Sequence, residues 1–252
     1  MSSVFDLHVH TVKGSSDSSL SLPDLVREAQ RVGLTGVCLT EHTGWRDLRE
    51  FDEFAARHDL VIIHALEVST VVGHVLAFGL DSYGVGFSNL RELRRAAHRV
   101  GGYLVTAHVF RNLFNPPPYN KSLVFPDPSS YPRNVQDALS HPVFHMVDDI
   151  EVLNGANTDQ ENTFAGEVAK YLGENGTGGS DAHSIHGIGS CVTVFDGDIR
   201  SKADLLEALR SGNYHSRLGG TDEDGYSCQG VDSTPSLDPA PTSFVDSCCQ
   251  RR

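Results

Sequence analysis

The sequence predicts an α/β protein in which short strands alternate with helices. Short apolar runs and amphipathic stretches follow one another roughly seven times between residue 4 and about residue 212. The apolar runs are rich in β-branched residues and do not alternate strictly with polar ones, which is typical of strands buried on both faces. This order predicts parallel βα units. A chain of 252 residues suffices for one α/β barrel or for one to two smaller domains.

The predicted strands are short and mostly β-branched or apolar. They cover residues 4–8, 37–40, 61–67, 74–79, 104–108, 150–153, a short segment near 179–181, and 191–195.

The predicted helices lie between these strands. The first covers residues 23–31, because Pro23 is favourable in a first helical turn and Gly33 is a typical stop. The second carries Leu48, Phe51 and Phe54 on one face, and its charged residues are expected to face solvent. Helical spacing places this second helix and three later ones at residues 46–58, 88–100, 160–173 and 202–211.

Two segments interrupt the pattern. Residues 111–133 contain six prolines and several aromatic residues, which predicts a long loop that is either a lid or a rigid structural excursion. Residues 219–252 are rich in Gly, Ser, Asp and Pro and lack any periodicity, so we expect a disordered tail. Residues 1–218 are therefore predicted to form the folded domain.

Composition restricts the partners and the compartment. A formal net charge of −13 and the lack of a basic stripe argue against an extended nucleic-acid-binding surface and against a membrane partner. The N-terminus has no signal-peptide pattern and no apolar run approaches a membrane span. The five cysteines form no CxxC pair, and an odd number without a secretion signal predicts a reducing cytoplasm.

Histidines and acidic residues fall at the ends of the predicted strands. In a parallel barrel these ends meet at one rim, where active sites lie. Imidazole with bridging carboxylate suits Zn, Mn or Fe, and this number of ligands exceeds what one ion needs. The candidates at strand ends are His8, His10, His42, Glu67, His108, Asp181 and His183.

These segments resemble the PHP (polymerase and histidinol phosphatase) family of metal-dependent phosphoesterases over roughly residues 4–215. The resemblance rests on DLHVHT at 6–11, SDS at 16–18, TEH at 40–42, ALE at 65–67, GHVL at 73–76, AH at 107–108, EVLNG at 151–155 and GSDAH at 179–183.

The resemblance implies a distorted (βα)7 barrel of the TIM type and a site for two or three divalent ions. By this resemblance, His8, His10, Glu67 and Asp181 hold one ion, and Glu67 bridges to a second that also binds His108. A third group would comprise Asp17, His42 and His183. Asp17 lies further beyond His10 than in many members, so a binuclear site is an open alternative.

One ligand of the family pattern has no obvious counterpart here. Many members carry a further histidine between the motifs of His108 and Asp181, and His141 and His145 lie in that interval without a recognisable motif. Glu41 is expected to support His42 from behind. Glu151 and Asn154 are expected to shape the rim. His64, inside an apolar run, is expected to be a buried core residue, whereas His58, His98 and His215 should be exposed.

The expected reaction is hydrolysis of a phosphate ester by a metal-activated water. Arg111 and His74 are predicted to bind the substrate phosphate, and Asp181 or His183 to pass a proton to the leaving oxygen. The predicted substrate is a small phosphorylated metabolite or nucleotide. Two alternatives are a nuclease that acts on nucleic acid ends and a metal-binding regulatory module without activity. The sequence does not specify an oligomeric state.

Overall fold

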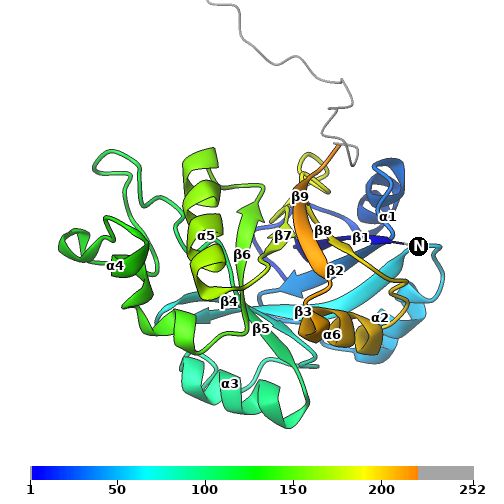
Figure 1. The fold of residues 1–252 in the computed structure, drawn as a ribbon. Coiled ribbons are helices and arrows are strands. Elements are labelled where there is room, and N and C mark those ends of the chain that lie inside the picture. The colour runs from blue at the N-terminus through cyan, green and yellow to red at the C-terminus, as the bar shows by residue number, and fades with distance from the viewer. Residues whose placement is uncertain (1, 221–252) are drawn as a thin grey trace, which may run out of the picture.

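A computed structural model describes residues 2–220 of the chain. Its nine strands form one sheet in the order β7-β6-β5-β4-β3-β2-β1-β8-β9 (Figure 1). The strands are β1 (Ser3–Val9), β2 (Gly36–Glu41), β3 (Val61–Thr70), β4 (Gly73–Phe78), β5 (Tyr103–Thr106), β6 (Asp149–Asn154), β7 (Thr177–Gly179), β8 (Cys191–Phe195) and β9 (Tyr214–Leu218).

The sheet curls until the segment after β7 meets β1. Asp181 donates its backbone N–H to the carbonyl of His8 at 2.7 Å, and His10 donates to the carbonyl of Ala182 at 3.0 Å. These bonds nearly close the sheet into a barrel at the ends of the parallel strands. The predicted class, α/β with a distorted barrel of the PHP type, is confirmed.

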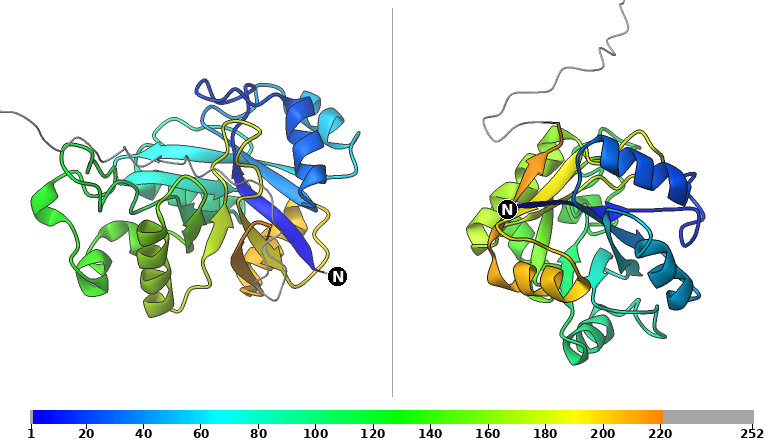
Figure 2. Two further views of the ribbon diagram at one scale, coloured as in Figure 1. Left: turned by 90° about the horizontal axis from the view of Figure 1, so that it is seen from above. Right: turned by 90° about the vertical axis from the view of Figure 1, so that its right-hand side faces the viewer.

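The helices lie around the outside of the strands (Figure 2). They are α1 (Leu22–Arg31), α2 (Leu48–Ala55), α3 (Leu90–Arg99), α4 (Val135–Leu139), α5 (Asp159–Leu172) and α6 (Lys202–Ser211), with 3-10 turns η1 (Pro128–Ser130) and η2 (Pro142–His145). Each begins after a side chain that accepts a backbone N–H of the first turn, as Ser21 does for α1 and Asp47 for α2. None of the helices in residues 2–220 has the length and apolarity needed to cross a membrane.

The barrel interior is filled by aromatic and aliphatic side chains. Phe5 and Phe195 pack edge to face at 5.9 Å and are fully buried. Leu205 and Leu209 of α6 belong to the same cluster and cover its lower end. Phe5 needs the glycine opposite, because a Cβ at Gly36 would lie 2.3 Å from its ring.

Not all strands are parallel, contrary to the prediction. β3 and β4 form a hairpin in which Thr70 pairs with Gly73, and β4 is also antiparallel to β5. Only two residues join β3 to β4, which is too few for the crossover that parallel strands need. As a result, β4 starts at the rim where the parallel strands end, and this places His74 there.

The structure describes all of the first irregular segment but only residues 219–220 of the second. The loop over residues 111–133 is fixed by buried side chains: Val124 packs on Gly73, and Phe125 stacks on Phe110 at 5.9 Å. These contacts favour the rigid alternative over a lid. The expected disordered tail lies outside the described residues from residue 221 on, and the domain boundary at residue 218 stays a prediction. The sequence reasoning also missed β9.

Candidate metal centre

Three groups of side chains at the barrel rim have the composition and spacing of metal sites. The groups are His8, His10, Glu67 and Asp181; Glu67, His74 and His108; and His10, His42 and His183. Glu67 belongs to two groups and His10 to two, so the three form one continuous centre. The residues of these groups come from β1, β3 and β4 and from the segments that follow β1, β2, β5 and β7.

The central group is fully enclosed, with all four residues buried. The Nε2 atoms of His8 and His10 lie 3.0 Å apart. The Oε2 of Glu67 is 3.5 Å from His8 Nε2 and 3.2 Å from His10 Nε2. The Oδ1 of Asp181 lies at 3.4 and 3.3 Å from the same two nitrogens. Ligands about 2.0–2.1 Å from a tetrahedral Zn²⁺ are about 3.3–3.4 Å apart, so the spacing fits one ion.

The hydrogen bonds behind the imidazoles determine which nitrogen is free. The Nδ1 of His8 lies 2.8 Å from Glu151 Oε1, so it carries the proton and donates. The Nδ1 of His10 lies 3.0 Å from Ser15 Oγ, and that hydroxyl donates onward to Glu41 Oε2 at 2.7 Å. When neutral, both imidazoles therefore direct the lone pair of Nε2 toward the two carboxylates. Four acceptors face one another, which is the donor set that a cation requires.

The second group is built on the other oxygen of Glu67. Its Oε1 lies 2.8 Å from His74 Nδ1 and 2.8 Å from His108 Nε2. His108 has a backbone φ of +32°, an unusual conformation for a residue with a side chain. Because Glu67 reaches both groups, it is placed to bridge two ions.

The third group lies nearest to solvent. Asp17 Oδ2 is 3.3 Å from His42 Nε2 and 3.4 Å from His183 Nε2. The Nδ1 of His183 donates to the Asp181 carbonyl at 2.9 Å, which leaves its Nε2 free for an ion. Asp17 is 56% exposed on its side chain, in contrast to the buried acids of the central group. The structure thus brings Asp17 close to His42 and His183, and its role as a ligand stays a prediction.

The electrostatics of the centre favour positive charge. Burial opposes charge on His8, but the carboxylates of Asp181, Glu151 and Glu67 outweigh it and raise the His8 pKa well above its ordinary value. Burial likewise opposes charge on Glu67, yet the surrounding histidines hold the pKa of its carboxyl well below the usual range. Burial lowers the pKa of His108, which keeps that imidazole neutral and able to bind metal.

Arg111 lies beside the central group. Its Nη2 donates to Asp181 Oδ2 at 2.6 Å and to Asn154 Oδ1 at 2.7 Å. Its Nε donates to Asn157 Oδ1 at 3.0 Å. Within residues 2–220, Nη1 of Arg111 has no hydrogen-bond partner. His74 lies against Glu67 Oε1.

The remaining histidines lie where the structure gives them other contacts. His141 caps η2 and packs against Phe125 at 5.0 Å, and His145 bonds to the Leu139 carbonyl at 3.2 Å. Neither belongs to one of the three groups, whereas His74 belongs to the second. His64 is buried on the outside of β3, as the sequence indicated.

Two supporting residues escaped the sequence reasoning. Asp6 is fully buried and accepts backbone N–H groups of Ser180 and Gly189 at 2.8 and 2.9 Å, so it ties β1 to the segment that carries Asp181. Burial raises its pKa to about 6. Its position two residues before His8 on the same strand face was the available signal. Ser15, which holds His10, has no such signal because it lies in an irregular loop.

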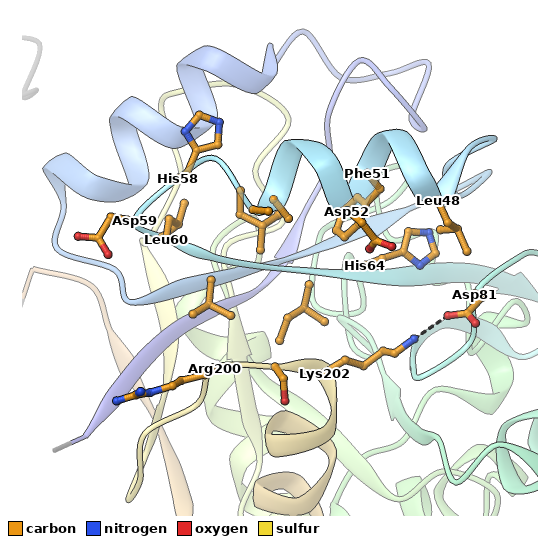
Figure 3. A pocket seen from close by; sticks show the side chains of 16 residues that line it. Leu48, Phe51, Asp52, His58, Asp59, Leu60, His64, Asp81, Arg200 and Lys202 are labelled. Atoms are coloured by element: carbon orange, nitrogen blue, oxygen red, sulfur yellow. Dashed lines mark hydrogen bonds and ion pairs between the residues drawn. The ribbon is translucent and has the colours of Figure 1, made fainter.

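A large cavity of about 590 Å³ lies away from this centre (Figure 3). It lies between α2, the start of β3 and the N-terminus of α6, with Phe51, Leu60 and Lys202 among its walls. The metal centre instead begins at Glu67, further along β3 at the opposite end of the strand. No ligand group of the three lines this cavity.

Two protein-family models match the chain: a PHP domain over residues 6–136, which is more than half of the 252 residues, and a PHP-associated region over residues 159–214. A comparison with curated protein sequences found no match.

Solved structures with a similar fold come from several bacteria and an archaeon. PsfC from Pseudomonas syringae matches with a TM-score of 0.58 and 18% identity, over 86% of this chain and 91% of PsfC. A candidate metal-dependent phosphoesterase from Bifidobacterium adolescentis gives 0.57 and 16%, over 82% and 96%. The lesion-specific endonuclease PfuEndoQ from Pyrococcus furiosus gives 0.51 and 16%, over 88% and 60%. At these identities the likeness concerns the fold alone.

Proposed function

The chain belongs to the PHP domain family, and from this premise we propose that it hydrolyses a phosphate ester of a small phosphorylated metabolite or nucleotide. The observation that carries the proposal is the continuous ligand centre, in which the two oxygens of Glu67 face different groups of histidines. Ions held a few ångströms apart by a shared carboxylate suit in-line displacement at phosphorus.

We propose that the centre takes two or three divalent ions of Zn, Mn or Fe, because imidazole and carboxylate are ligands that these metals share. His8, His10, Glu67 and Asp181 would hold the first, and Glu67, His74 and His108 the second. Asp17, His42 and His183, with His10 at their side, would hold a third. Bound ions supply Lewis acidity and lower the pKa of water.

The chain itself binds and orients the phosphate. Arg111 is fixed through Nε and Nη2, so its Nη1 can donate to a phosphate oxygen without further loss of side-chain freedom. His74 can approach the phosphate from the other side of the centre, although its contact with Glu67 makes a ligand role the stronger assignment.

The leaving oxygen needs a proton, for which the sequence suggested Asp181 or His183. Asp181 is a poor donor, because the nearby imidazoles and Arg111 hold its pKa far below the ordinary value despite burial, and Arg111 occupies its Oδ2. His183 is one-third exposed. We therefore assign the proton to His183 when the third group is free of metal, and a ligand role to His183 when it is not.

The alternative functions are weaker. PfuEndoQ is a lesion-specific endonuclease with a similar fold, but the net charge of −13 disfavours a long nucleic-acid track on this chain. A regulatory module without activity would not need a complete ligand set.

We also propose a reducing compartment, since Cys38 and Cys191 are free and buried.

The test is an activity screen with matched variants. The purified protein, loaded with Mn²⁺ or Zn²⁺, is given phosphomonoesters, cyclic phosphodiesters, nucleotides and single-stranded DNA. We expect turnover of phosphomonoesters that H8A and D181A abolish and that H145A, an exposed histidine outside the centre, retains. Cleavage of DNA alone would favour the nuclease, and full activity of H8A would refute the assignment.

A further inference from the structure

Three side chains that are not metal ligands join the ligand groups from behind, and we call Glu151, Asn154 and Arg111 the bracing residues. Glu151 is 1% exposed. Its Oε1 accepts from His8 Nδ1 at 2.8 Å, and its Oε2 accepts the backbone N–H of His108, also at 2.8 Å. One carboxylate therefore holds a side chain of the central group and the backbone of a ligand in the second group.

Asn154 connects Glu151 to the arginine. Its Nδ2 donates to Glu151 Oε2 at 2.9 Å, and its Oδ1 accepts from Arg111 Nη2 at 2.7 Å. The same Nη2 donates to Asp181 Oδ2 at 2.6 Å. A continuous path of hydrogen bonds thus runs from His8 through the bracing residues to Asp181.

The path contacts the two ligands whose backbones are strained. His108 has φ of +32° and Asp181 has φ of +56°, and neither is a glycine. Such conformations are unfavourable for a residue with a side chain and persist only where surrounding contacts hold them. Glu151 bonds to the backbone of His108, and Arg111 bonds to the side chain of Asp181.

We propose that Asn154 is a positioning residue that keeps the central and second ligand groups in one geometry for metal binding, by orienting Glu151 and Arg111 together. The inference rests on the metal centre proposed above. It assigns a role in metal affinity to Asn154, a residue that touches neither a proposed metal ligand nor the substrate.

Only an amide meets both demands at this position. Glu151 Oε2 needs a donor and Arg111 Nη2 needs an acceptor, and Asn154 presents one of each. A carboxylate of the same shape would keep the bond to Arg111. It would also set an unprotonated oxygen against Glu151 in a site that is 1% exposed at both residues.

The experiment compares N154D with N157D in the full chain. Asn157 is the matched control, because it also accepts from Arg111, at Nε and 3.0 Å, but has no bond to Glu151. Metal affinity is measured by competition with a chromophoric chelator for Co²⁺ and Zn²⁺. The visible spectrum of the Co²⁺-loaded protein reports coordination geometry independently of activity.

We expect N154D to bind metal about 10- to 100-fold more weakly than wild type, as for other residues that orient metal ligands, with an altered Co²⁺ spectrum. N157D should retain the wild-type affinity and spectrum. If N154D does not fold, N154S is measured in the same way, since its shorter side chain cannot span both partners. Wild-type affinity and spectrum in the residue-154 variant, or an equal loss in N157D, would overturn the proposal. Neither readout depends on whether the protein hydrolyses phosphate esters.

Discussion

Asp149, the first residue of β6, allows a prediction of stability against pH. It is 1% exposed, and its carboxylate accepts from the backbone N–H groups of Ile150 and Gly176 and from the Tyr214 hydroxyl. Burial raises its pKa from 3.8 to about 6, although these hydrogen bonds pull the other way. The folded state therefore holds this proton more tightly than the unfolded chain does.

The magnitude follows from the two pKa values. A difference between 3.8 and about 6 corresponds to roughly 3 kcal/mol. Because the folded pKa is the higher one, the stability that the protonated group contributes is full below pH 3.8 and is lost as pH rises through about 6. In the D149N variant no proton is exchanged at this position, and the loss of stability disappears.

The assay is urea unfolding of metal-free wild type and D149N from pH 4 to pH 7, with chelator present so that metal binding does not contribute. The unfolding free energy of D149N relative to wild type should rise by roughly 2.5 kcal/mol over this range, because part of the full difference is already lost at pH 4. Y214F should extend the wild-type decline to higher pH, because it removes a bond that lowers the Asp149 pKa. A constant difference between D149N and wild type at all pH values would refute the reasoning.

Three further outcomes follow from the centre. E67Q should contain less bound metal than wild type, as measured by elemental analysis, because the carboxylate of Glu67 faces residues of all three groups. An unchanged metal content would contradict the role of Glu67 as a shared ligand. G179A should weaken metal binding and lower the melting temperature, because a Cβ at residue 179 would lie 2.4 Å from the Cβ of His8. A Cβ in the control variant G166A meets nothing within 4 Å, so G166A should be neutral or stabilising by up to about 1 kcal/mol. R111K should reduce kcat/KM for a phosphomonoester about 10- to 100-fold through the loss of charge-assisted bonds, and equal kinetics in R111K and wild type would exclude Arg111 from phosphate binding.

The ligands were predictable because strand ends carry them. His8 lies on β1 and His10 follows its last residue, Val9, so the alternation of an extended chain puts both side chains on one face. His42, Glu67 and His108 each follow or end an apolar run, so their convergence required only that the strands share a direction.

The part that sequence reasoning missed depends on chain reversal and on local strain. His74 lies beside Glu67 because the chain reverses over two residues between β3 and β4, with Gly73 at φ of +104°. The sequence of an apolar run does not show whether its strand is parallel or antiparallel to its neighbour. Asp181 was expected within a strand, but β7 ends at Gly179 and Asp181 follows in a left-handed conformation. The contact of Asn154 with Arg111 joins residues 43 positions apart, which no local pattern encodes.

The central claim is that one continuous centre holds two or three divalent ions and that these ions are needed for hydrolysis of a phosphate ester. The direct measurement is a titration of chelator-treated protein with Mn²⁺ or Zn²⁺, in which bound metal per chain and phosphomonoesterase activity are determined on the same samples. We predict no activity without metal, and full activity only when two or three ions are bound. Activity that persists in metal-free protein, or saturation of the sites with fewer than two ions per chain, would contradict the account.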